Sequence, residues 1–141
     1  MMAAALNGAL ASQKGLGGVH AMSHALADIG RGRPDHGQGG LDHGAINAVL
    51  LPLVLEFNQP AAAPRYEEIG RELGLPAGTD LADAIVRLRE RIALPARLGE
   101  LGVEEGDLEC TAARAAANYC NRTNPRHADA HDYLLLLRAA L

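Results

Sequence analysis

Apolar and polar residues follow one another along this chain with the period of an α-helix. After Asp80, for example, Leu81, Ile85, Leu88 and Ile92 recur at spacings of three and four, which places them on one helix face. No stretch shows the strict alternation of a half-buried β-strand. With the glycine and proline breaks, the pattern predicts helices over residues 1–12, 16–29, 44–57, 64–73, 81–92, 104–119 and 129–141. We therefore expect an all-α fold, a compact bundle of six or seven short helices forming a single domain over residues 1–141.

The stretch 44–57 is apolar on nearly every side, which is typical of a central buried helix. Pro52 is expected to kink or split it, because proline removes a backbone donor and its ring clashes with the preceding turn. The run Asn58-Gln59-Pro60 is expected to end it. Residues 30–41 are rich in glycine, arginine and aspartate, so we expect a surface loop there.

Composition narrows the classes of function. The chain has 141 residues, enough for one domain, and its net charge of −4 is mild. Its basic residues are scattered, so we expect no nucleic-acid partner. The longest apolar run falls short of the about 20 residues that span a bilayer, and the first residues lack the basic region of a signal peptide. We therefore expect a cytoplasmic protein with no membrane partner. Cys110 and Cys120 are too few for a disulfide framework and are expected to be small, reduced core residues.

Three histidines are the strongest candidates for chemistry. His20 and His24 are four residues apart on a predicted helix and share one face, and His43 arrives from a loop at the start of the next helix. Neutral imidazole is a common ligand of zinc, iron and copper. We interpret the three histidines as half of a metal site. A His-x-x-x-His pair alone is more often two ordinary polar positions, and Ala21 stands where a metalloprotease would need glutamate.

Several nearby residues allow two interpretations. Asp28 lies four residues after His24 and either hydrogen-bonds its ring or is a plain exposed residue. Asp42 either orients the neighbouring histidine or caps the helix that follows. His36 is expected to be a solvated loop histidine. The run KGLGG at 14–18 has no preceding strand, so close backbone packing at a helix start is favoured over a phosphate loop.

Two longer motifs carry a resemblance to a known family. Residues 14–24 read KGLGGVHAMSH and residues 43–52 read HGAINAVLLP. Both resemble the C-terminal helical domain of the iron-containing (group III) alcohol dehydrogenases, and 54–58, 98–103 and 123–126 follow in the family's order. The segment between the two motifs is longer than in many members. The residue before the second motif is aspartate, where a subgroup of the family has a second histidine.

The resemblance implies a site and its cofactors. In that family one aspartate and three histidines hold a catalytic divalent metal, Fe²⁺ or sometimes Zn²⁺, and two of those histidines match His20 and His43. A further histidine, one turn after the first and thought to help move the alcohol proton, matches His24, which is therefore the candidate catalytic residue. The other two metal ligands lie upstream of anything in this chain. So does the domain that binds NAD(P), with its Gly-Gly-Gly-Ser loop, and no residue here is a candidate for binding that cofactor.

We therefore expect the C-terminal metal-binding and substrate-side domain of an NAD(P)-dependent alcohol dehydrogenase, which interconverts small alcohols and aldehydes by hydride transfer. Separated from the nucleotide-binding domain, it is expected to be inactive and to associate with itself as a homo-oligomer. The first alternative is a non-catalytic helical interaction module with structural histidines. The second is a metal-dependent hydrolase or a metal-storage domain.

Overall fold

The computed structural model describes residues 2–30 and 41–141, without the side chains of residues 4, 5 and 28–30. Over these residues the chain is built from helices alone, and it contains no strand there. The elements are α1 (Met2–Ser12), α2 (Gly18–Gly30), α3 (His43–Glu72), α4 (Leu81–Arg91), η2 (Leu98–Leu101), α5 (Glu105–Ala117), η3 (Tyr119–Thr123) and α6 (Ala130–Ala140). The all-α prediction is confirmed. The loop expected over 30–41 lies almost wholly outside the described residues.

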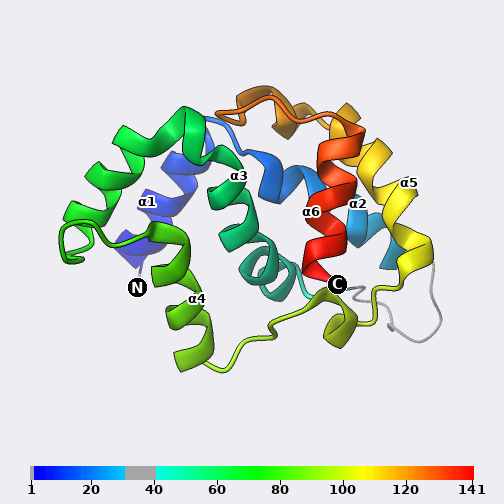
Figure 1. The fold of residues 1–141 in the computed structure, drawn as a ribbon, viewed down its shortest axis with the longest axis horizontal. Helices are drawn as coiled ribbons and strands as arrows, with labels where there is room; N and C mark the ends of the chain where they lie inside the picture. The colour runs from blue at the N-terminus through cyan, green and yellow to red at the C-terminus, as the bar shows by residue number, and fades with distance from the viewer. Residues whose placement is uncertain (1, 31–40) are drawn as a thin grey trace.

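The core forms where α2, α3, α5 and α6 meet. Helix α5 packs against both α6 and α2, and α3 packs against α2, α4 and α6; Figure 1 shows α3, α2 and α6 together at the centre of the molecule. The largest fully buried side chains there are Tyr133, Met22, Leu26, Ile46, Leu50, Leu98, Leu108 and Leu137. Most of them are aliphatic, as expected for a chain rich in alanine and leucine, and their burial supplies most of the driving force for folding.

Aspartates begin three of the helices. The Asp42 carboxylate accepts a hydrogen bond of 2.8 Å from the backbone N–H of Ala45, and Asp80 accepts from the first turn of α4 in the same way. Asp129 caps α6. These bonds satisfy backbone donors that a helix start leaves without partners. The capping interpretation of Asp42 is therefore confirmed.

Helix α3 differs from the prediction. The sequence predicted two helices separated at Asn58-Gln59-Pro60, yet α3 continues through Pro52, Pro60 and Pro64 to Glu72. Figure 1 shows that it bends along its course, which is how a helix accommodates internal proline. Just before the predicted break, the Arg126 guanidinium donates a hydrogen bond of 3.2 Å to the Phe57 carbonyl and lies 4.0 Å from the centre of the Phe57 ring.

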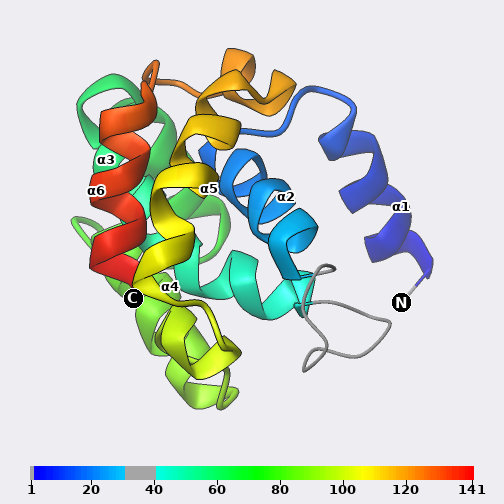
Figure 2. The ribbon, with the colours of Figure 1, turned by 90° about the vertical axis from the view of Figure 1, so that its right-hand side faces the viewer.

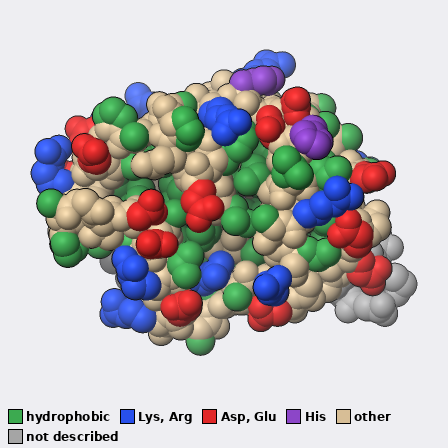
Figure 3. Space-filling model, in the orientation of Figure 1, with side chains coloured by type: hydrophobic (Ala, Val, Ile, Leu, Met, Phe, Trp, Pro, Cys, Tyr) green, Lys and Arg blue, Asp and Glu red, His purple; other side chains and the backbone are tan. Residues whose placement is uncertain are grey.

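Helix α1 is set apart from the core. Its large apolar side chains Met2, Leu6 and Leu10 are 89%, 61% and 58% exposed, and Figure 2 shows the helix standing away from α5 and α6. Acidic and basic side chains are interspersed on the face in Figure 3, as the scattered charges of the sequence suggest. Within the described ranges, no helix combines the length and hydropathy needed to cross a membrane.

Candidate functional site

The structure brings the three predicted histidines together. His20 and His24 lie one turn apart on α2, and His43 is the first residue of α3, where the Asp42 cap fixes the start of the helix. The ring centroids are 5.8 Å apart for His20 and His24, 5.5 Å for His20 and His43, and 5.7 Å for His24 and His43. The imidazoles therefore form a nearly equilateral triangle. The third ring comes from a different helix, as the sequence predicted.

The separations of the three rings can be compared with those of imidazoles that share a metal ion. Two imidazoles on one tetrahedral metal ion have ring centroids roughly 5 Å apart, given the usual metal–nitrogen distance. His20 and His43, at 5.5 Å, are the pair nearest to that value. In the described part of the chain, however, no group of three or more His, Cys, Asp or Glu side chains is arranged to hold a metal ion.

The surroundings of His20 favour its neutral form. Burial lowers the pKa of His20 below its ordinary value of 6.5, and the neighbouring His43 and His24 lower it further, because each would repel a second positive charge. A metal ion binds the neutral ring, so a lowered pKa keeps His20 in its ligating form over a wider pH range.

His24 has a partner of its own. Its Nδ1 lies 3.8 Å from the Sγ of Cys120, which is 1% exposed. Tyr119, the residue before Cys120, places its ring centroid 6.3 Å from that of His24. Residues of η3 therefore lie against the histidine cluster on its His24 side, although they are about a hundred residues further along the chain than His24.

The same segment also fixes the start of α2. The Asn124 side-chain Oδ1 accepts a hydrogen bond of 2.9 Å from the backbone N–H of Gly18, two residues before His20. A Cβ on Gly15 would come within 2.6 Å of the Thr123 side chain, and Gly15 has a positive φ of 115°. The glycines of KGLGG are therefore needed for close packing at a helix start, which confirms that interpretation.

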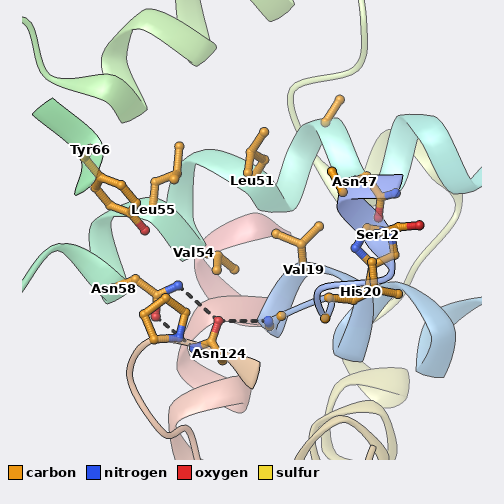
Figure 4. A pocket seen from close by; sticks show the side chains of 17 residues that line it. Ser12, Val19, His20, Asn47, Leu51, Val54, Leu55, Asn58, Tyr66 and Asn124 are labelled. Carbon is orange, nitrogen blue, oxygen red and sulfur yellow. Dashed lines mark hydrogen bonds between the residues drawn. The ribbon is translucent and has the colours of Figure 1, made fainter. Parts of the chain in front are cut away.

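A cavity of about 550 Å³ adjoins the cluster. Figure 4 shows it between the loop before α2 and the inner side of α3, with His20, Ser12 and Asn47 at one end and Tyr66 and Asn58 at the other. Its walls between these ends are mostly apolar, formed by Val19, Leu51, Val54 and Leu55 among others. The Asn47 side-chain oxygen is buried there, without a hydrogen-bond partner among the described residues.

Several residues of this region escaped the sequence analysis. Cys120 is buried as predicted, but the prediction gave it no part in the site, and Asn47 and Asn124 were not singled out. The placement of Cys110 in the core is wrong: it is exposed, because it lies on the outer side of α5. His36 and the side chain of Asp28 lie outside the described residues, so their interpretations stay predictions.

Comparison with known proteins decides the family. The profile of the Fe-containing alcohol dehydrogenase family, C-terminal, matches residues 1–141. The chain belongs to this family. It is 40% identical to 4-hydroxybutyrate dehydrogenase of Cupriavidus necator over 145 residues, covering all of this chain and 37% of that protein. It is 32% identical to the NAD-dependent methanol dehydrogenase of Bacillus methanolicus over 135 residues, covering 90% of this chain and 33% of that enzyme.

Solved structures agree with this assignment. The domain superposes on 1,3-propanediol oxidoreductase with a TM-score of 0.76 and 31% identity, over 89% of this chain and 33% of that one. It matches an iron-containing alcohol dehydrogenase from Thermococcus thioreducens with a TM-score of 0.72 and 35% identity, over 89% of this chain and 32% of that one. This iron-containing alcohol dehydrogenase domain therefore spans about a third of the length of the relatives it matches.

Proposed function

We propose that this chain is the C-terminal, metal-site and substrate-side part of an NAD(P)-dependent alcohol dehydrogenase that interconverts small alcohols and aldehydes. The observation that carries the proposal is the triangle of His20, His24 and His43, with centroids 5.5–5.8 Å apart, in a domain of this family. Because the chain matches only about a third of its relatives' length, we propose that NAD(P) and the remaining metal ligands are held by other segments and that the isolated chain is inactive.

His20 and His43 are the proposed metal ligands. Their rings are the pair nearest in separation to two imidazoles on one ion, and the pKa of His20 is lowered in the direction that favours ligation. Fe²⁺ or Zn²⁺ is the proposed ion, and when bound it supplies Lewis-acid polarisation of an alcohol or carbonyl oxygen. Imidazole is a suitable ligand for both metals.

His24 is the proposed catalytic residue, as the group that exchanges a proton with the alcohol. It lies one turn from His20 and 5.7 Å from His43 between ring centroids, so it stands beside both of the proposed metal ligands. Neutral imidazole is suited to taking up a proton near neutral pH. The ring is held on its other side by Cys120.

The adjoining cavity is the proposed place for the body of the substrate. Its apolar walls suit a short aliphatic chain, and His20 lies at one end of the cavity (Figure 4). The names of related proteins refer to 4-hydroxybutyrate, methanol and 1,3-propanediol, all of them small. These relatives support a small alcohol as the substrate, and their names differ in which alcohol it is.

The test starts from the coding sequence upstream of Met1, which is read for a Gly-Gly-Gly-Ser loop and an Asp-x-x-x-His helix. The protein that contains both is then assayed for metal content and NAD(P)-linked alcohol oxidation. His43→Ala should abolish metal retention, whereas His24→Ala should keep the metal and slow turnover by about 10²–10⁴-fold. His131→Ala, at an exposed position on α6, is the matched control and should change neither. Normal metal content and turnover after His43→Ala would contradict the proposal.

The exposed apolar side of α1 favours a second candidate, a helical interaction module. Contiguous exposed apolar surface commonly marks an interface, and Met2, Leu6 and Leu10 all lie on α1. We expect the chain to associate with itself through this helix. Sedimentation analysis of the Leu6→Glu/Leu10→Glu variant should then show a smaller species than the parent chain. An interaction module without catalysis would be favoured if the upstream coding sequence lacked both motifs.

A further inference from the structure

The sulfur of Cys120 is in contact with the imidazole ring of His24. Cys120 is buried, and its backbone is held on both sides: its N–H donates 2.9 Å to the Asn118 side chain, and its carbonyl accepts 3.1 Å from the Thr123 hydroxyl. The sulfur therefore has a fixed position in η3. From that position it meets the Nδ1 of His24 at 3.8 Å, and the two residues are 96 positions apart in the sequence.

The contact distinguishes the two ring nitrogens of His24. Nδ1 faces sulfur, which leaves Nε2 as the nitrogen free to exchange a proton with a ligand. In neutral imidazole one nitrogen carries hydrogen and the other accepts, and a hydrogen bond at one of them selects the tautomer. An imidazole N–H is a strong donor that needs an acceptor when it is half-buried, whereas a thiol hydrogen is a weak donor that is cheaply left alone.

We infer that Cys120 is a positioning residue, whose sulfur accepts a hydrogen bond from the Nδ1–H of His24 and so presents Nε2 as the proton-accepting nitrogen. The inference rests on the proposed function, because it names the atom through which His24 takes up the alcohol proton. Nε2 gains that proton, and the Nδ1–H bond to sulfur is kept in both the neutral and the charged ring. Cys120 thus holds the orientation of the base and does not itself touch the reacting atoms.

The test is the tautomer of His24 in the 141-residue chain, read from the ¹⁵N shifts of its two ring nitrogens at about pH 8, where histidine is ordinarily neutral. No metal and no cofactor are added. We expect the Nδ1–H form to dominate in the parent chain. In Cys120→Ala the equilibrium should shift toward the Nε2–H form.

Cys110→Ala is the matched control, since it removes the exposed cysteine and should leave the His24 shifts unchanged. A dominant Nε2–H form in the parent chain would overturn the inference, and so would identical His24 shifts in the parent and Cys120→Ala. The parent spectrum alone decides the question if Cys120→Ala fails to fold. Because no turnover is measured, the positioning role can fail while the dehydrogenase proposal stands. If the Nδ1–H tautomer is found while the activity test of His24 fails, the proposed function alone is contradicted.

Discussion

The side-chain amides of Asn58 and Asn124 face each other in a two-way hydrogen-bonded pair, although they are 66 positions apart. Asn58 Nδ2 donates 3.0 Å to Asn124 Oδ1, and Asn124 Nδ2 donates 2.8 Å to Asn58 Oδ1. The same Asn124 oxygen accepts from the backbone of Gly18. The Asn124 side chain therefore joins the middle of α3 to the first turn of α2, and so it positions the helix that carries His20.

Replacing Asn124 should destabilise the fold. Asn124→Ala leaves the buried Asn58 amide without its partner, and an unsatisfied buried polar group costs about 1–3 kcal/mol. Urea unfolding should show a loss of this size, with an unchanged dependence on urea concentration. Asn7→Ala, at an exposed position on α1, is the control and should have a much smaller effect. Equal effects of the two substitutions would show that the amide pair contributes nothing specific.

A second buried network depends on Tyr133. Its hydroxyl donates 2.8 Å to the Asn121 side-chain oxygen, while Asn121 Nδ2 donates to the carbonyls of Ala116 and Ala128. Tyr133 is fully buried, and burial raises the pKa of its hydroxyl, so that it stays a donor at any ordinary pH.

Tyr133→Phe keeps the ring but leaves the Asn121 oxygen without its donor, so it should lower the free energy of unfolding by about 1–3 kcal/mol. Thermal and urea unfolding measure this loss. The control is Tyr119→Phe, because Tyr119 is 65% exposed and should lose little. A Tyr133→Phe variant as stable as its parent would mean that the Asn121 oxygen finds another donor.

The lowered pKa of His20 predicts how stability changes with pH. In the folded chain, burial and then the nearby His43 and His24 hold the pKa of His20 below 6.5, its ordinary value in an unfolded chain. Between these two pKa values the unfolded state binds more protons, so stability rises with pH through this window. The contribution of neutral His20 to stability is complete above about pH 6.5, and it is lost as the pH falls through the pKa that His20 has in the folded chain.

Comparing the parent with His20→Gln isolates this contribution. The difference in unfolding free energy between the two chains should be constant above about pH 7. On acidification to about pH 5 the parent should lose stability relative to His20→Gln. Urea unfolding at a series of pH values gives the two curves. A difference that moved in favour of the parent on acidification would mean that His20 gains a partner for its charged form.

Much of this fold follows from local sequence signals. The periodicity of Leu81 to Ile92 and the capping aspartates predicted helices where they occur, and His20 and His24 were placed on one face by spacing alone. The continuation of α3 was missed because proline is locally a helix-breaking signal, whereas α3 runs through both Pro60 and Pro64. The contact of Cys120 with His24 was missed because only the packing of η3 on α2 brings the two together.

The isolated chain should bind a metal ion only weakly. His20 and His43 supply only half of the usual four or so protein ligands, and the described residues hold no arranged group of three or more ligands. Calorimetric titration of the isolated chain with Zn²⁺, and with Fe²⁺ under anaerobic conditions, should therefore show only weak binding. The binding that remains should disappear in the His20→Ala/His43→Ala double variant and survive in His131→Ala, whose histidine lies on the exposed side of α6. If a stoichiometric metal survives dialysis against a chelator, the chain carries a complete site, and His24 would be the first substitute ligand to test because its ring already lies 5.8 Å from that of His20.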